Sequence, residues 1–345
     1  MRVEAHFESG GFAALKPEWN ALLGRSRNDA LFLTWEWQST WWKHLGDGQM
    51  LLLGFRSGDD GRLVGIAPLF ASKADQGQTT LSVIGCRDVS DYLDLIVERG
   101  QEEAVYQALL DYLQGEAFPW HVLDLCNLPQ ESLGPALLRS LAAERGFQTR
   151  VETEDVCPII DLPATWDEYL SLLDKKQRHE VRRKLRRADS EADTRFLVVG
   201  DAHDLHAEME AFIQLHQKST PEKDKFMDPQ MQRFFFDVAQ VLQAQGWLQL
   251  TFVEMDGRKA ASLLNFDYGD SVLVYNSGYD PGQFSHLSPG WVVTARCIEH
   301  AIALGRRKFD FLRGNEDYKY RFGGRDTEVR RLLIARPGVE LEATC

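Results

Sequence analysis

Hydrophobic and polar positions alternate along this chain with two different periods. Some segments repeat every second residue, as strands do, and others repeat every three to four residues, as helices do. The spacing predicts a helix over residues 32–46 and then a hairpin over 50–70 around a Gly-Asp-Asp-Gly turn. We expect four more elements after this hairpin: a strand at 92–98, a helix near 101–114, a strand at 121–126 and a helix near 133–145. The mixed periods predict an α+β protein.

Four tryptophans lie in the first of these helices. Trp35, Trp37, Trp41 and Trp42 are close enough to cover one helix face and part of the next. Large rings of this kind bury 150 Å² or more each, so we interpret them as core or interface residues rather than ligand contacts.

The second half of the chain repeats the order of the first half. Residues 248–267 line up with 51–70, because each segment contains a strand, an Asp-Gly turn followed by Arg, and a second strand. In both halves another strand, a helix and a strand with an aspartate near its end follow. We predict two copies of one mostly antiparallel unit with a helical crossover between the last strands, divided between residues 151 and 165. Residues 1–155 are assigned to the first domain and 156–345 to the second.

Composition and charge narrow the class of protein. A chain of 345 residues with 44% hydrophobic residues is expected to form two globular domains. The net charge of -13 argues against a general nucleic-acid binder. No run reaches the roughly 18 apolar residues of a membrane helix and no signal peptide is evident, so we expect a cytoplasmic protein. The five cysteines have no paired spacing and are interpreted as free thiols: Cys86, Cys126, Cys157, Cys297 and Cys345.

Ser288, Pro289 and Gly290 stand before a helix that follows the third strand of the second copy. A helix that begins directly after a strand offers backbone N–H groups and the positive end of its dipole to an anion. This start is therefore a candidate phosphate site, with an ordinary capped helix as the alternative. The helix near 101–114 begins with acidic residues that would repel phosphate, so we assign anion binding to the second copy.

A strongly basic segment covers residues 172–189, and its apolar positions form a narrow stripe that would dock a helix. Three interpretations stay open for it: a solvated helix face, a site for a phosphorylated ligand, and a surface for RNA. Its positive residues are Lys175, Lys176, Arg178, Arg182, Arg183, Lys184, Arg186 and Arg187.

Residues 309–324, FDFLRGNEDYKYRFGG, combine a short apolar run with charges, aromatic rings and a Gly-Gly pair. A solvated loop does not need this much aromatic surface, and a buried strand would avoid these charged residues. The simpler alternative is that Asp310 pairs with Arg313 and that the rings pack the last strand.

Four segments together resemble the CelD-like acetyltransferases of the GNAT superfamily, which are related to the Fem-type aminoacyltransferases. These segments are WEWQSTWWKHLG with the hairpin after it, LLDKKQRHEVRRKLRRA, SGYDPGQFSHLSPG and KFDFLRGNEDYKYRFGG. The resemblance implies tandem GNAT-like domains. The pyrophosphate loop usual in the superfamily is replaced here by Leu287-Ser288-Pro289-Gly290.

The resemblance also implies an activity, the direct transfer of an acyl group from acetyl-CoA or a longer acyl-CoA to a small-molecule or sugar-linked amine. Transfer needs a base for the amine, a donor to the oxyanion and an acid for the departing sulfur. We expect Asp310 or Glu316 as the base and Tyr318 as the acid. The donor would contact Ser288, Pro289, Gly290, Tyr279 and Arg313, and anionic substrate groups would contact Lys319, Arg321, Arg182, Arg183 and Arg186.

Two other functions stay open. One is a non-catalytic binding or scaffold protein of polysaccharide or envelope synthesis, and the other is a Fem-like transferase that uses aminoacyl-tRNA. No permanently bound cofactor is expected. His203 and His206 lack a third ligand, so no metal site is predicted. Residues 216–235 either connect helices or fold over an acceptor site.

Overall fold

The chain forms two compact units. The computed structural model describes residues 1–58, 60–73, 77–86, 89–115 and 118–341. Unit 1 contains Met1–Asp155 together with the chain from Glu328 onward, and unit 2 is Val156–Thr327. The division made from the sequence placed everything after residue 155 in one domain. Residues 328–335 instead belong to unit 1, because strand β13 (Arg325–Ala335) pairs antiparallel with β6 (Val122–Pro129).

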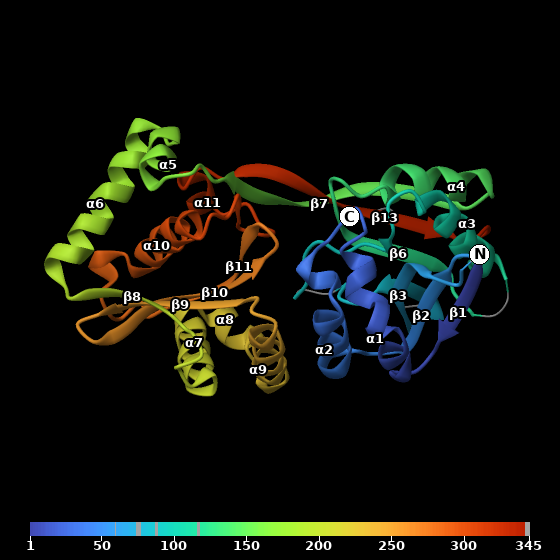
Figure 1. The fold of residues 1–345 in the computed structure, drawn as a ribbon, viewed down its shortest axis with the longest axis horizontal. Coiled ribbons are helices and arrows are strands. Elements are labelled where there is room, and N and C mark those ends of the chain that lie inside the picture. Colours follow the sequence, from blue (N-terminus) through green and yellow to red (C-terminus); the bar gives the residue numbers. More distant parts are fainter. Residues whose placement is uncertain (59, 74–76, 87–88, 116–117, 342–345) are drawn as a thin grey trace. The chain divides into compact units, whose positions relative to one another are not determined.

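Unit 1 is a mixed sheet with helices on both faces (Figure 1). Its strands follow the order β1-β2-β3-β4-β6-β13, with β5 paired to β3. The strands not yet named are β1 (Arg2–His6), β2 (Gln49–Arg56), β3 (Leu63–Lys73), β4 (Thr79–Val83) and β5 (Ile96–Val97). Its helices are α1 (Gly10–Leu23), the 3₁₀ turn η1 (Leu31–Leu33), α2 (Trp35–Leu45), α3 (Glu102–Gln114), the π-helical turn η3 (Gly134–Leu138) and α4 (Arg139–Glu144).

Two glycines of the predicted hairpin allow helices to approach this sheet closely. A Cβ on Gly54 would lie 3.3 Å from Leu15 of α1, and a Cβ on Gly65 would lie 2.9 Å from Val105 of α3. Gly65 is paired with Phe55, the neighbour of Gly54 in β2, so the two glycines face opposite sides of the sheet. Helices α1 and α3 therefore cover opposite faces of unit 1.

The tryptophan-rich helix α2 is confirmed as a core element. Trp37 and Trp41 are fully buried, and Trp35 and Trp42 are partly buried. The Thr34 side chain caps the helix by accepting the N–H of Trp37.

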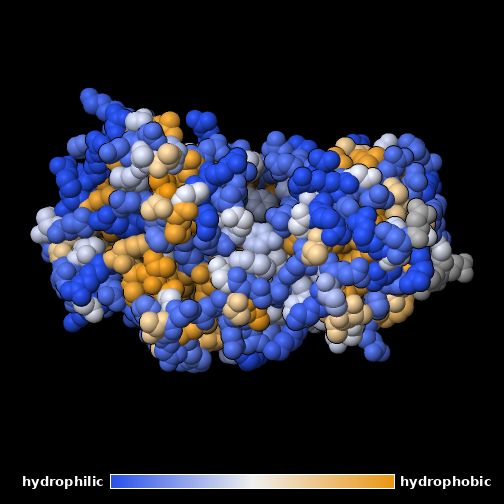
Figure 2. Space-filling model, viewed as in Figure 1, coloured by the Kyte–Doolittle hydropathy of each residue, from blue (hydrophilic) through white to orange (hydrophobic). Residues whose placement is uncertain are grey.

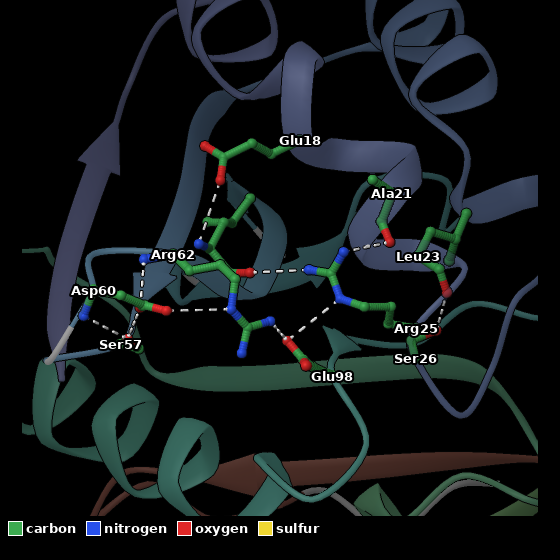
Figure 3. Close-up of polar contacts among 10 residues, drawn as sticks. Glu18, Ala21, Leu23, Arg25, Ser26, Ser57, Asp60, Arg62 and Glu98 are labelled. Carbon is green, nitrogen blue, oxygen red and sulfur yellow. Dashed lines mark hydrogen bonds and ion pairs between the residues drawn. The ribbon is translucent and has the colours of Figure 1, made fainter.

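A polar network ties the end of α1 to the start of β3 (Figure 3). The Arg25 guanidinium donates to the Ala21 carbonyl at 2.9 Å and to the Leu63 carbonyl at 3.4 Å. Glu98 accepts ion pairs from Arg25, at 3.5 Å, and from Arg62. Because one carboxylate serves two arginines from separate elements, it fixes the hairpin against the helix.

Unit 2 contains the second hairpin and its surrounding helices. Its strands follow the order β7-β12-β11-β10-β9-β8. They are β7 (Gln148–Asp161), β8 (Thr194–Val198), β9 (Leu248–Met255), β10 (Arg258–Tyr268), β11 (Ser271–Tyr279) and β12 (Lys308–Asp310). Its helices are α5 (Trp166–Leu172), α6 (Lys175–Glu191), α7 (Leu205–Ser219), α8 (Pro221–Phe226), α9 (Pro229–Ala244), the 3₁₀ turn η4 (Ser285–Leu287), α10 (Pro289–Ala303) and α11 (Asp317–Arg321). Strands β7 and β13 each cross the boundary between the units.

Helices cover both faces of this sheet as well. In Figure 1, α7, α8 and α9 lie on one side of strands β8–β11, and α10 with α6 lies on the other. The predicted Asp-Gly hairpin is confirmed, since Asp256 and Gly257 adopt φ values of 50° and 73° between β9 and β10. The basic helix α6 docks through Val181, Leu185 and Ala188, which are buried in the core shared with α10.

The two copies share a parallel strand pair. In unit 2, β11 and β12 are parallel and joined through α10; in unit 1, β4 and β6 are parallel and joined through α3. The expected third strand of the first copy, residues 92–98, is wrong: only Ile96–Val97 forms a strand there, and Thr79–Val83 occupies the third position.

The expectation of free thiols fails for two cysteines. Cys86 and Cys126 form a disulfide across 40 residues of chain. Cys157 and Cys297 are free and buried, while Cys345 lies outside the described residues.

Gly278 is the position where α7 approaches β11 most closely. A Cβ there would lie 2.5 Å from the backbone nitrogen of His216 and 2.7 Å from the Leu215 carbonyl carbon. We expect Gly278→Ala to lower the free energy of unfolding by about 1–3 kcal/mol, because backbone atoms cannot give way as a side chain can. Chemical denaturation measures this change.

Gly200→Ala is the matched control, because a Cβ at Gly200 would meet nothing within 4 Å. Equal stability of the two variants would show that α7 can shift away from β11 at little cost.

Candidate functional site

Strands β11 and β12 part after a short parallel ladder. They pair only from Ser271 with Lys308 to Leu273 with Asp310. Beyond that point β11 continues to Tyr279, while β12 ends and the chain turns at Leu312, whose φ is 55°. The backbone groups of β11 beyond Leu273 thus have no β12 partner on that side.

A bulge interrupts β11 just beyond the point of parting. Leu264 of β10 pairs with Asn276, and Asn265 pairs with Val274, so Tyr275 is the extra residue. A bulge leaves its extra residue outside the regular ladder and re-aims the neighbouring side chains.

A buried lysine holds the turn that follows β12. The Lys319 ammonium donates to the carbonyl oxygens of Leu312, Arg313 and Gly314, at 3.2, 2.7 and 3.0 Å. It also pairs with Glu316 at 2.9 Å, and the residue is only 2% exposed. This set of partners differs from the anion-binding role expected for Lys319, since the ammonium is already occupied within its own loop.

Asp310 supports the same turn. It is 5% exposed, and its Oδ1 accepts the N–H of Leu312 at 2.7 Å. The hydrogen bond stabilises the left-handed backbone of Leu312, a conformation that leucine rarely adopts.

Glu316 and Tyr318 lie on the outer side of this turn. The Glu316 side chain is 59% exposed. Tyr318 is 36% exposed, and its ring packs edge-on against Phe311 at 5.8 Å between centroids. Although the residue as a whole is partly exposed, burial around the hydroxyl raises the pKa of Tyr318, and the Glu316 charge raises it further, so the phenol is a weaker acid than a free tyrosine and is protonated at neutral pH.

Lys223 reaches the end of β11 from α8. Its ammonium donates to the Ser277 carbonyl at 2.6 Å and to the Ser277 hydroxyl at 3.0 Å. Burial lowers the pKa of Lys223 to about 8, while the charge of Glu316 opposes this shift. The segment over residues 216–235 therefore brings an amine with a perturbed pKa towards the turn that carries Glu316.

His216, on α7, contacts the residue of β11 next to the one that Lys223 binds. Its Nε2 is 3.0 Å from Oδ1 of Asn276, one residue after the bulge. Burial lowers the pKa of His216 to about 4, with a further lowering from the Lys223 charge and an opposing effect of Asn276. The imidazole is therefore neutral at pH 7. Neither His216 nor Lys223 was predicted as a site residue, and only the proline-containing charged segment around them gave a signal.

Tyr279 ends β11 with its side chain exposed. The Ser219 hydroxyl accepts the Tyr279 N–H at 2.9 Å and donates to the Tyr279 carbonyl at 3.2 Å. Arg313 is partly buried in the turn after β12, and Arg321 is exposed at the end of α11.

Helix α10 begins at Pro289, as predicted, but its first turn offers few donors. Ser288 adopts a left-handed backbone, and its side chain makes no capping bond. Pro289 has no N–H, and the N–H groups of Trp291 and Val292 already donate to the Ser288 carbonyl. Only the Gly290 amide is left for an anion, in open space where a Cβ would meet nothing within 4 Å.

The basic segment forms α6, and its three candidate arginines do not share one environment. Arg182 and Arg186 line a pocket of about 690 Å³ between α5, α6 and α10, whereas Arg183 is not among its described lining residues.

Two searches bear on other kinds of site. Within the described ranges, no three His, Cys, Asp or Glu side chains gather as metal ligands would. No helix in that part of the chain has the length and apolar character needed to cross a membrane.

One protein family matches the part of the chain that carries this geometry. Residues 175–320 match the acetyltransferase (GNAT) domain family. The match begins at α6 and ends in α11, so it includes the diverging strands and the turn held by Lys319. This family match supports the expectation that the protein is an acyltransferase. A search of curated proteins finds no match.

Solved structures agree on the fold. FemX has a TM-score of 0.68 at 14% identity, over 96% of this chain and 97% of that one. The C-terminal domain of a putative lysylphosphatidylglycerol synthetase from Agrobacterium fabrum has a TM-score of 0.55 at 10% identity, over 94% and 92%. A tandem GNAT protein from the clavulanic acid biosynthesis pathway has a TM-score of 0.50 at 13% identity, over 98% and 100%. The predicted α+β fold of tandem GNAT-like domains is confirmed, and the narrower CelD-like assignment stays a prediction.

The neutrality of His216 can be tested by pH titration. A histidine whose pKa falls from 6.5 to about 4 on folding binds no proton in the folded state over most of that range. The unfolded chain does bind one, so stability falls as pH drops from 6.5 towards 4, by up to about 3 kcal/mol. Histidine NMR should show a resonance that does not titrate above about pH 5.

His216→Gln is the control, because it keeps a side-chain N–H near Asn276 but cannot titrate. It should remove that resonance and reduce the loss of stability on acidification. A His216 midpoint near 6.5 would contradict the assignment.

Proposed function

We propose that unit 2 transfers an acyl group from a CoA thioester directly to an amine acceptor. The observation that carries this proposal is the parting of β11 and β12 beside the Tyr275 bulge, next to the turn of Glu316 and Tyr318. Diverging strands with backbone groups outside the ladder can accept an extended acyl arm and hydrogen-bond its carbonyl.

The proposed reaction proceeds in one complex. The acceptor nitrogen forms a bond to the thioester carbonyl carbon, and its proton passes to a carboxylate. Backbone N–H groups of β11 beyond its ladder with β12 stabilise the oxyanion. The carbon–sulfur bond then breaks, and Tyr318 donates its proton to the departing thiolate. Tyr318 carries that proton at neutral pH as any phenol does, and its raised pKa makes it a weaker acid, so the proposal depends on the place of the hydroxyl beside the parting strands.

Glu316 fits the role of base better than Asp310. Asp310 is buried and holds the Leu312 turn, whereas the Glu316 side chain is 59% exposed, so an acceptor could reach it although one of its oxygens pairs with Lys319 at 2.9 Å. Lys319 and Asp310 then act as positioning residues for this turn.

Lys223 fits an electrostatic role. An ammonium has three donors, and two of them bind Ser277. The remaining donor and the positive charge would favour an oxyanion or thiolate at the end of β11.

The residues around the parting strands and the start of α10 would contact the CoA donor. The Gly290 amide at the start of α10, beside Ser288 and Pro289, would bind one phosphate oxygen. Tyr279 and Arg313 border the parting strands, and Arg321 would contact an anionic acceptor group. Unit 1 has acidic residues, Glu102 and Glu103, in the first turn of its equivalent helix α3. We therefore assign unit 1 no donor site and a non-catalytic role.

An aminoacyl donor is the second candidate. The basic helix α6 and the likeness to FemX and to a putative lysylphosphatidylglycerol synthetase favour it. Acetyl-CoA and aminoacyl-tRNA, offered separately with a panel of amines, distinguish the donors by the product that forms.

Thermal unfolding with CoA or acetyl-CoA tests the proposal before any acceptor is known. A ligand that binds only the folded state raises the melting temperature, by an amount set by its concentration relative to Kd. We expect a rise with acetyl-CoA. No rise with either compound, together with no thiol release, would favour the scaffold or tRNA-dependent alternatives.

Substitutions in the turn test the roles of individual residues. We expect Tyr318→Phe and Glu316→Gln each to lower kcat by at least about tenfold, since each removes a proton-transfer group. Glu316→Gln also removes the counter-charge of Lys319, so its kcat is compared only at a temperature where denaturation shows that the variant is folded. Asp310→Asn should reduce stability more than chemistry. Release of CoA thiol measures turnover, and denaturation measures stability.

Arg307→Gln is the control, because Arg307 pairs on the surface with Asp270 before β12. Full activity in both Tyr318→Phe and Glu316→Gln would show that the residue roles are wrong.

A further inference from the structure

Helices α5, α6 and α10 border a second candidate site, an open pocket apart from the parting strands. A pocket of about 690 Å³ lies between them, within the size range of small-molecule sites. Figure 2 shows hydrophilic residues over α6, the helix that supplies most of the pocket wall. The pocket is lined by Trp166, Asp167, Leu170, Lys175, Arg178, His179, Arg182, Leu185, Arg186, Asp189 and Arg296.

The pocket is cationic. Five lysine and arginine side chains face two carboxylates. One of these carboxylates, Asp189, is already paired with Arg296 at 2.9 Å, and Arg296 also binds Glu299 at 2.9 Å. The positive charge of the rest of the pocket is therefore opposed mainly by Asp167.

Three arginines of α6 follow one helical stripe. Arg178, Arg182 and Arg186 are spaced by four residues, which places successive side chains about 6 Å apart along the helix axis. One guanidinium group can donate two parallel hydrogen bonds to the oxygens of one phosphate. A row of three such groups can therefore contact successive phosphates of one ligand.

An aromatic ring lines the same pocket as these arginines. Trp166 begins α5, is only partly buried, and packs on Tyr169 at 5.0 Å between ring centroids. Leu170 lines the pocket beside it. A tryptophan next to a row of arginines can stack a heterocyclic base while the arginines bind phosphates.

We infer that this pocket binds a nucleotide or nucleotide-linked compound, with its phosphates on Arg178, Arg182 and Arg186 and its base on Trp166. A compact ligand fits better than RNA, because a protein of net charge -13 repels an extended polyanion beyond the pocket. The site does not depend on the proposed acyl transfer. Its Lys175 end adjoins α11, since Gln177 donates to the Tyr320 carbonyl at 3.0 Å.

Binding assays on the full chain test this site without any activity measurement. Calorimetry in phosphate-free buffer would compare ATP, CoA and inorganic tripolyphosphate as probes. We expect tripolyphosphate to bind and ATP to bind about three- to tenfold more tightly through stacking. CoA is measured on the wild-type protein and on the Arg182→Gln, Arg186→Gln double variant: CoA binding that the variant loses belongs to this pocket, and CoA binding that it keeps belongs to the proposed donor site. Absence of binding by all three probes at millimolar concentration would overturn the proposal.

Matched charge variants separate a built site from general attraction. Arg182→Gln with Arg186→Gln should weaken tripolyphosphate binding by at least about tenfold. Arg183→Gln with Arg187→Gln removes the same charge from α6 outside the pocket lining and should change binding less than about threefold. An equal loss of tripolyphosphate affinity in the two double variants would show non-specific attraction and overturn the proposal. A short RNA that competes with ATP equally well in the two double variants would instead indicate an RNA-binding surface.

Trp166→Leu tests the base position. It should remove the advantage of ATP over tripolyphosphate and leave tripolyphosphate binding unchanged. An unchanged advantage in a folded Trp166→Leu protein would overturn the stacking assignment. Arg182 and Arg186 are exposed, so their substitution tests the phosphate positions even where Trp166→Leu does not fold.

Discussion

The buried ammonium of Lys319 is the constraint on which the candidate active site depends. A charge taken out of water costs several kcal/mol unless hydrogen bonds and an opposite charge replace its solvent. Here three carbonyl oxygens and the Glu316 carboxylate replace it. The same bonds force the chain after β12 into a tight turn, which ends the ladder with β11. The two strands diverge at that turn, and Glu316 lies on it with its side chain 59% exposed.

The two units keep one topology and differ in chemistry. Each has a parallel pair joined by a helical crossover, β4 with β6 and β11 with β12. The crossover helix of unit 1 starts with two glutamates, whereas that of unit 2 starts with proline and glycine. The two helix starts therefore differ in charge, and the glutamates of α3 disfavour an anion at the start of that helix.

Local patterns predicted the local structure, and contacts between distant residues stayed hidden. The Asp256–Gly257 hairpin and the start of α10 could be read from the sequence because turn and helix-start residues act on their neighbours. The Cys86–Cys126 disulfide and the pairing of Lys223 with Ser277 join residues 40 and 54 positions apart, and no spacing rule marks them. Lys319 looked like an exposed cation because its carbonyl partners carry no signature in side-chain type. Residues 92–98 were misassigned because their apolar run packs in the core without forming a full strand.

The position of β13 has a consequence for how the chain folds during synthesis. Its pairing with β6 makes unit 2 an insertion between two parts of unit 1. A ribosome releases residues in order, so the inserted unit has its whole chain available before the surrounding one does. Until β13 is synthesised, the edge of β6 that pairs with it stays without that partner. A chain stalled before residue 328 would expose this edge to aggregation.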